Sequence, residues 1–80
     1  MSIVIGTVDL TLFGCPMHYI KAREALYSIE QNKQVLLRVN SGDPVKEILK
    51  SLRQDGQLCE IESEDILTTT IKVTKKYDRN

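Results

Sequence analysis

The pattern of apolar and polar positions along the chain predicts four strands. Residues 7–12 alternate between the two kinds, with Val8, Leu10 and Leu12 on one side, as in a strand that buries one face. Three further strands are predicted from their β-branched and aliphatic content, at residues 34–40, 57–63 and 66–75. In the last of these we expect a buried face formed by Leu67, Thr69, Ile71 and Val73.

Two other segments carry apolar residues at helical spacing. From residue 16 to about residue 32 the stripe consists of Tyr19, Ala22, Leu26 and Ile29. In the second segment it consists of Val45, Ile48, Leu49 and Leu52. Pro16 and Pro44 mark the predicted starts, because a proline in the first turn loses no hydrogen bond. The predicted N-caps are Cys15 and Asp43. Gly56 suits the left-handed position that ends a helix.

The order β-α-β-α-β-β predicts an α+β protein built as a two-layer α/β sandwich. Each helix is apolar on one stripe only, so we expect both helices on one face of a four-stranded mixed sheet. Each helix can cross over between parallel strands, and the last two strands can form a hairpin around a polar turn at 62–65. We expect a single domain over residues 1–80, in which residues 76–80 form a flexible tail.

Composition narrows the possible functions. Eleven Lys and Arg balance eleven Asp and Glu, so the formal net charge is zero, unlike that of a dedicated nucleic-acid binder. No apolar run approaches the roughly 18 residues of a membrane span, and the first residues lack the basic segment of a secretory signal. We therefore expect a cytoplasmic protein, and the polar outer faces of its predicted helices indicate a monomer. Two cysteines and one histidine fall short of the usual four or so zinc ligands, so no metal is expected.

Cys15 stands at the most reactive position that the sequence indicates. Because it directly precedes Pro16, its sulfur is expected at the positive end of the helix dipole. Backbone N–H groups of Met17 and His18 could point at it there. Both effects favour the thiolate and would lower the thiol pKa below about 8.5. Such a sulfur is a nucleophile that could carry a second sulfur as a persulfide. The alternative is a structural role, since cysteine is also a common small hydrophobic residue.

Residues 9–16, with the sequence Asp-Leu-Thr-Leu-Phe-Gly-Cys-Pro, resemble the opening of the TusA/SirA-like sulfur-carrier family. That family carries a Cys-Pro-x-Pro motif between its first strand and first helix, and here His18 replaces the second proline. The resemblance continues through residues 42–44 (Gly-Asp-Pro) and Gly56 to the final hairpin. It implies a fold similar to the C-terminal domain of translation initiation factor three. It also implies Cys15 as the carrier residue.

The family resemblance implies a sulfurtransferase-type carrier without a dissociable cofactor. It would accept sulfur from a cysteine desulfurase or a rhodanese-like protein and pass it to an acceptor protein. The pathway would be tRNA thiolation, cofactor assembly or sulfur metabolism, with neither direct nucleic-acid binding nor a membrane involved. Gly14, Pro16 and Met17 would form the helix N-terminus that supports the thiolate. The alternative is a non-catalytic interaction or regulatory module on the same fold, with Cys15 as a capping residue only.

Several other side chains each have two interpretations. His18 is expected either to tune Cys15, by pairing with the thiolate or protonating a leaving sulfur, or to face solvent without a role. Cys59 is expected to be a buried core thiol, or else a resolving partner of Cys15 if the two sulfurs approach closely. Lys21, Arg23 and Arg38 could form a basic rim for an acidic partner or for RNA; the simpler interpretation is that they are solvated surface residues.

Overall fold

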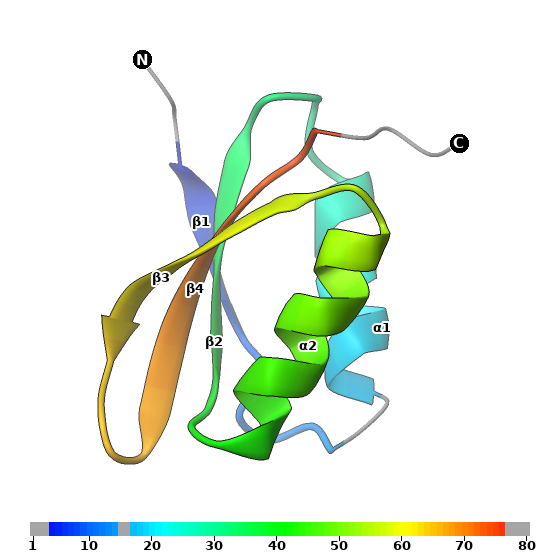
Figure 1. The fold of residues 1–80 in the computed structure, drawn as a ribbon. Coiled ribbons are helices and arrows are strands. Elements are labelled where there is room, and N and C mark those ends of the chain that lie inside the picture. Colours follow the sequence, from blue (N-terminus) through cyan, green and yellow to red (C-terminus); the bar gives the residue numbers. More distant parts are fainter. Residues whose placement is uncertain (1–3, 15–16, 77–80) are drawn as a thin grey trace.

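A computed structural model describes residues 4–14 and 17–76. The predicted order of elements is confirmed (Figure 1). The six elements are β1 (Val4–Asp9), α1 (Met17–Tyr27), β2 (Gln34–Asn40), α2 (Asp43–Gln54), β3 (Leu58–Glu64) and β4 (Thr68–Thr74). No helix in the described part of the chain has both the length and the apolar character needed to cross a membrane.

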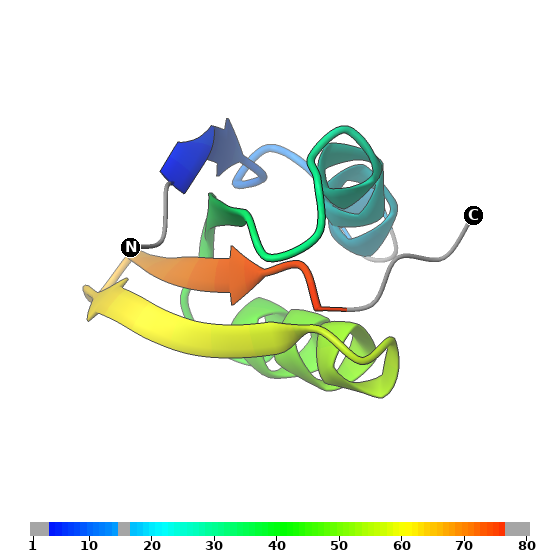
Figure 2. The ribbon, with the colours of Figure 1, turned by 90° about the horizontal axis from the view of Figure 1, so that it is seen from above.

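The four strands form one mixed sheet in the order β1-β2-β4-β3. β1 pairs with β2 in parallel, whereas β4 lies antiparallel to both β2 and β3. α2 therefore connects two strands that run in the same direction but have β4 between them. Both helices lie on the same face of the sheet, as Figure 2 shows. The prediction of a two-layer sandwich with both helices on one face is therefore confirmed.

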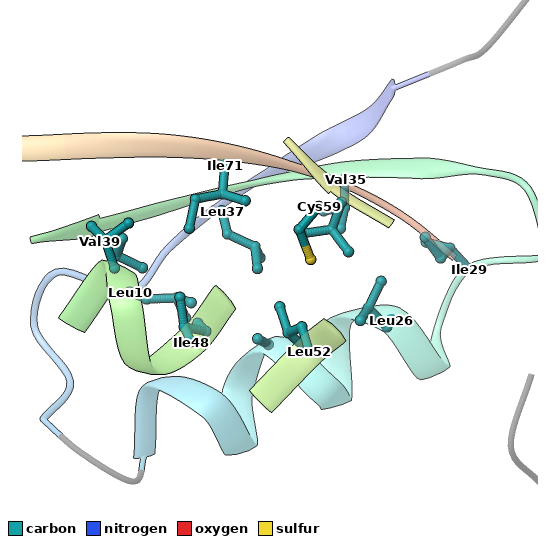
Figure 3. Close-up of a cluster of buried hydrophobic side chains, with 13 residues drawn as sticks. Leu10, Leu26, Ile29, Val35, Leu37, Val39, Ile48, Leu52, Cys59 and Ile71 are labelled. Carbon is teal, nitrogen blue, oxygen red and sulfur yellow. The ribbon is translucent and has the colours of Figure 1, made fainter. Parts of the chain in front are cut away.

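The core lies between this sheet face and the two helices (Figure 3). The middle strands β2 and β4 contribute much of it, because their alternate side chains point toward the helices. The helical stripes meet them, as the apolar spacing predicts. Fully or almost fully buried members of the core include Ala22, Leu26, Val35, Leu37, Val39, Ile48, Leu52, Ile71 and Val73.

The N-cap of helix α2 lies one residue earlier than predicted, and the helix begins at Asp43. Gly42 is its N-cap, with φ 100° and ψ −138°, a backbone conformation that glycine alone adopts readily. Its carbonyl accepts a hydrogen bond from the Val45 N–H at 3.1 Å, which places Asp43 inside the helix. The prediction of Asp43 as N-cap is therefore wrong. At the other end Gly56 has φ 89° and two backbone bonds close a Schellman motif, so the predicted helix end is confirmed.

β1 ends three residues before the predicted end of the strand. The Asp9 carboxylate accepts hydrogen bonds from the Thr11 backbone N–H (2.9 Å) and hydroxyl (2.6 Å), forming an Asx turn. The hydrogen bond from the Thr11 hydroxyl, followed by the backbone one, holds the pKa of the Asp9 carboxyl below its ordinary 3.8. Leu10 is still buried, but the turn breaks the alternation and leaves Leu12 91% exposed. The prediction that Leu12 shares the buried face is wrong.

The β3–β4 hairpin turns three residues later than predicted. β3 continues to Glu64, with a bulge between Ile61 and Ser63, so the predicted turn at 62–65 is mostly strand. The Asp65 N–H donates to the Thr68 carbonyl at 2.8 Å and closes the hairpin around Ile66 and Leu67. Leu67 is therefore 77% exposed, and its predicted place on the buried face of β4 is wrong.

α1 ends at Tyr27 rather than near residue 32. The Ser28 hydroxyl donates to the Ala25 carbonyl (2.7 Å), and Asn32 adopts a left-handed φ of 71°. The Asn32 N–H donates to the Lys75 carbonyl (2.6 Å), which ties this connection to the end of β4. Of the predicted flexible tail, only residue 76 is described, and residues 77–80 lie outside the described residues.

Candidate functional site

The segment between β1 and α1 contains the predicted nucleophile. Cys15 and Pro16 lie outside the described residues, but Gly14 and Met17 on either side of them are described. The His18 N–H donates to the Gly14 carbonyl at 3.0 Å, the bond that an N-cap carbonyl accepts. Gly14 therefore supports the start of the helix. The expectation that the His18 N–H is free to point at a sulfur is wrong, because this bond already uses it.

His18 points its side chain into the protein. It is 3% exposed and continues the buried stripe of α1 with Ala22 and Leu26, so the solvent-facing interpretation is wrong. Nδ1 accepts a hydrogen bond from the Tyr19 N–H (2.9 Å), which assigns the proton of the neutral ring to Nε2. Among the described residues Nε2 has no hydrogen-bond partner. An unpaired buried donor costs about 1–3 kcal/mol, which suggests a role other than packing.

Three connecting segments meet at the end of the sheet where β1 and β2 finish (Figure 1). The Asn40 side chain donates to the Thr11 carbonyl at 2.9 Å, joining the β2–α2 loop to the β1–α1 segment. The Ser41 N–H donates to the Leu67 carbonyl at 3.1 Å, joining the same loop to the β3–β4 turn. Residues far apart in sequence therefore share one end of the molecule.

The segments at this end carry several exposed large apolar side chains, which we call the apolar rim. Its members are Leu12, Phe13, Met17, Ile66 and Leu67. Leu12 and Ile66 are 91% and 89% exposed, so neither contributes to the core. Grouped exposed apolar side chains are typical of a surface that another molecule covers. Sequence reasoning missed the apolar rim because it assigned Leu12 and Leu67 to buried strand faces.

The three residues of the predicted basic rim are not brought together. Lys21 lies 3.6 Å from Glu24 and its ammonium nitrogen is 5.8 Å from the centre of the Phe13 ring. Arg23 takes part in contacts with α2, described below. Arg38 lies on β2, on the sheet face that the helices leave open, beside Asp9 of β1. The basic-rim interpretation is therefore wrong.

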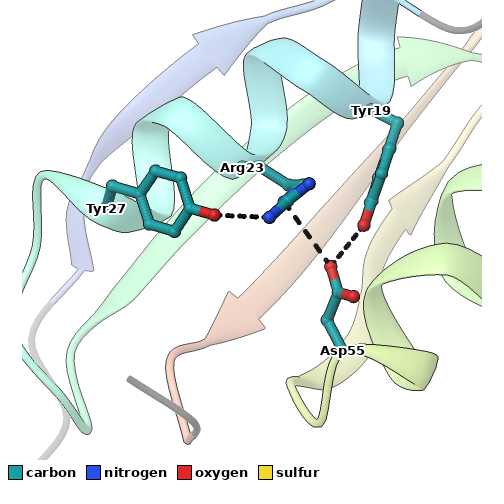
Figure 4. Close-up of polar contacts among 4 residues, drawn as sticks. All are labelled: Tyr19, Arg23, Tyr27 and Asp55. Carbon is teal, nitrogen blue, oxygen red and sulfur yellow. Dashed lines mark hydrogen bonds and ion pairs between the residues drawn. The ribbon is translucent and has the colours of Figure 1, made fainter. Parts of the chain in front are cut away.

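A polar cluster joins α1 to the end of α2 (Figure 4). The Tyr19 hydroxyl donates to Asp55 Oδ2 at 2.5 Å, and Arg23 Nε lies 3.9 Å from the same oxygen. The Arg23 guanidinium also donates to the Tyr27 hydroxyl and lies 5.5 Å from the centres of both tyrosine rings. Burial, followed by the bond to Asp55, raises the pKa of Tyr19. The cluster fixes the two helices against each other. Sequence patterns missed it because Tyr19 and Asp55 are 36 residues apart.

Cys59 is a buried core thiol, as one of its two interpretations predicts. It is 5% exposed, and its sulfur points from β3 into the core (Figure 3). Burial raises the pKa of the thiol from 9.0 to about 11, because the interior disfavours the thiolate. Since Cys15 lies outside the described residues, its distance from Cys59 stays untested.

We expect Cys59 to resist alkylation in the native protein. At pH 8 a thiol with a pKa of about 11 is ionised in only about one molecule in a thousand, and burial excludes the reagent as well. Iodoacetamide labelling followed by peptide mass mapping should modify Cys59 only after unfolding. Native labelling of Cys59 at the rate of a free cysteine would contradict its position in the core.

Within residues 4–14 and 17–76 no three His, Cys, Asp or Glu side chains gather closely enough to hold a metal ion. No protein-family model matches the chain, and no characterised protein matches its sequence.

Proposed function

We propose that this protein is a sulfur carrier, which accepts a persulfide on Cys15 and passes the terminal sulfur to an acceptor protein. The observation that carries the proposal is the apolar rim. Leu12 and Phe13 shortly precede Cys15 in the chain, Met17 follows it, and all three side chains are exposed. A carrier must dock its cysteine against protein partners, and exposed apolar residues beside it suit that task. The resemblance of residues 9–16 to the TusA/SirA-like family supports the same conclusion.

The proposed reaction is a transfer of one sulfur between two thiols. The Cys15 thiolate attacks the terminal sulfur of a persulfide on a cysteine desulfurase or rhodanese-like donor. A new sulfur–sulfur bond forms on Cys15, the bond within the donor persulfide breaks, and the donor cysteine leaves as a thiolate. Delivery to the acceptor repeats the exchange, so the transfer involves no net oxidation and no further cofactor. The reducing cytoplasm, where thiols stay free, suits this chemistry.

The first turn of α1 would favour the anionic sulfur. α1 has 11 residues, and its positive end lies directly after Cys15 and Pro16 in the chain. His18 is buried, its Nε2 has no hydrogen-bond partner among the described residues, and it is the proposed tuning residue. Its test is the pH dependence of Cys15 alkylation in His18→Leu, which fills the buried space that Ala would leave empty. An unchanged rate and apparent pKa would remove His18 from the mechanism.

The second candidate function is a non-catalytic interaction module on the same fold. It is favoured by His18 standing where the sulfur-carrier motif has its second proline. The apolar rim would also serve such a module as a docking surface, so the two functions differ in whether Cys15 takes up sulfur.

Loading with sulfur separates the two functions. After incubation with a cysteine desulfurase and L-cysteine, we expect mass spectrometry to find one added sulfur atom on Cys15. Cys59→Ala, which removes the other thiol, should still load, and Cys15→Ser should not. If the unmodified protein gains no sulfur under conditions in which an established carrier loads, the interaction module becomes the better assignment.

A further inference from the structure

The outer face of α2 carries a cluster of cations around an apolar residue. A shallow, open hollow of about 590 Å³ is lined by Lys46, Leu49, Lys50, Arg53 and Gln54. Leu49 is half-buried and packs against the core, while the three cationic residues are exposed. We call these five residues the α2 basic face.

The positive charges of the α2 basic face have no ion-pair partner among the described residues. Lys21, Arg23 and Lys72 each have a carboxylate within 4.0 Å. In the part of the chain that the structure describes, none of the three cations of the α2 basic face has such a partner. A chain with zero net charge thus concentrates unpaired positive charge on one side of one helix.

Arg53 is held in place at one end of the α2 basic face. Its guanidinium donates to the Cys59 carbonyl of β3 at 3.3 Å, so the side chain is oriented rather than free to move in solvent. Lys46 and Lys50 lie one helical turn apart, about 6 Å along the axis. Carboxylates on alternate residues of an extended segment repeat at about 6.6 Å, and carboxylates four residues apart on a helix repeat at about 6 Å.

We infer that the α2 basic face binds an acidic segment of a partner protein, with carboxylates against Lys46, Lys50 and Arg53. An apolar side chain among those carboxylates would contact Leu49. This inference does not depend on sulfur transfer, because it involves neither Cys15 nor the apolar rim. It assigns the protein a second contact surface with its own charge preference.

Two observations favour a short acidic protein segment over a nucleic acid. Nucleic-acid binding gains affinity from many phosphate contacts at once, whereas the α2 basic face offers three cations. The half-buried Leu49 also suits a partner with apolar side chains.

Amide NMR titration of the full chain with three probes tests the inference. The probes are the peptide Glu-Asp-Glu-Leu-Glu-Asp-Glu, its uncharged Gln-Asn-Gln-Leu-Gln-Asn-Gln counterpart, and an oligouridylate of matched charge. With the acidic peptide we expect saturable chemical-shift changes confined to α2 and the start of β3, and we expect added salt to weaken this binding. The uncharged peptide should cause no such changes. Lys46→Gln with Lys50→Gln should weaken binding about tenfold. The matched pair Arg38→Gln with Lys76→Gln removes the same charge elsewhere and should leave the affinity unchanged.

Four outcomes would overturn the inference. The first is an absence of saturable shifts with the acidic peptide, and the second is an equal loss of affinity in both double variants. Tighter binding of the oligouridylate would identify a nucleic-acid surface instead. Concentration-dependent self-association that only Lys46→Gln with Lys50→Gln removes would identify a second copy of this chain as the occupant. Sulfur loading of Cys15, measured separately, should be the same in both double variants as in the unmodified protein.

Discussion

Leu37→Ala is expected to lower the free energy of unfolding by about 3–4 kcal/mol. Leu37 lies in the middle of β2, is 0% exposed, and faces the helices between neighbouring strands on both sides. Truncation there removes apolar burial and leaves a cavity that a sheet held from both sides closes only in part. A chain of 80 residues has a total stability of about 4–12 kcal/mol, so the variant should lose a large part of it.

Leu12→Ala is the matched control for that loss. The same side chain is removed, but Leu12 is 91% exposed, so we expect a change of no more than about 0.5 kcal/mol. Urea unfolding followed by far-ultraviolet circular dichroism measures both. The alternating pattern of residues 7–12 predicts a buried Leu12. If Leu12→Ala lowered the free energy of unfolding as much as Leu37→Ala does, Leu12 would be buried as the alternating pattern predicts, and the observed turn at Thr11 would be contradicted.

Leu12→Ser combined with Leu67→Ser is expected to raise the apparent KM for a persulfide donor at least about tenfold, with kcat little changed. This expectation rests on the proposed sulfur transfer. The expectation treats both leucines as interface anchors, each of which costs more than about 1 kcal/mol when truncated, and the two lie on separate segments of the apolar rim. Because both side chains are exposed, the stability should be unaffected. The measurement is the loading rate of Cys15 against the concentration of persulfidated cysteine desulfurase.

Leu58→Ser is the control for this docking prediction. Leu58 is exposed to a similar degree as Met17 of the apolar rim. It is the first residue of β3, whereas Ile66 and Leu67 follow the other end of that strand. It should leave KM unchanged. A fall in kcat with constant KM in the double variant would mean that the apolar rim acts on the chemistry rather than on docking. An equal rise in KM with Leu58→Ser would mean that the effect is not confined to the rim.

The elements and their order could be predicted because each depends on neighbours in sequence. The β2 pattern predicts Gln34–Asn40, and these are the bounds observed. Gly56 ends α2 where predicted, because a left-handed backbone is a property of the residue itself. The misplaced boundaries depend instead on single hydrogen bonds. The bond between Asp9 and Thr11 ends β1, and the bond between Asp65 and Thr68 sets the hairpin turn.

The candidate site divides in the same way. Cys15 and Pro16 could be singled out from sequence, since a cysteine and a proline before an amphipathic helix have local chemical meaning. The burial of His18 could also have been found, because it lies four residues before Ala22 on the same stripe. The apolar rim could not, because its members come from segments that only the pairing of β2 with β4 brings to one end.

By itself, then, the sequence determined six elements, their order and the two layers, and it singled out Cys15 as the candidate nucleophile. These follow from the periods of strand and helix and from the residues that end them. Only the tertiary structure decided which apolar side chains stay outside the core and which cations lack a carboxylate. Both depend on distances between residues remote in sequence, where one turn or one residue of register exchanges a buried side chain for an exposed one.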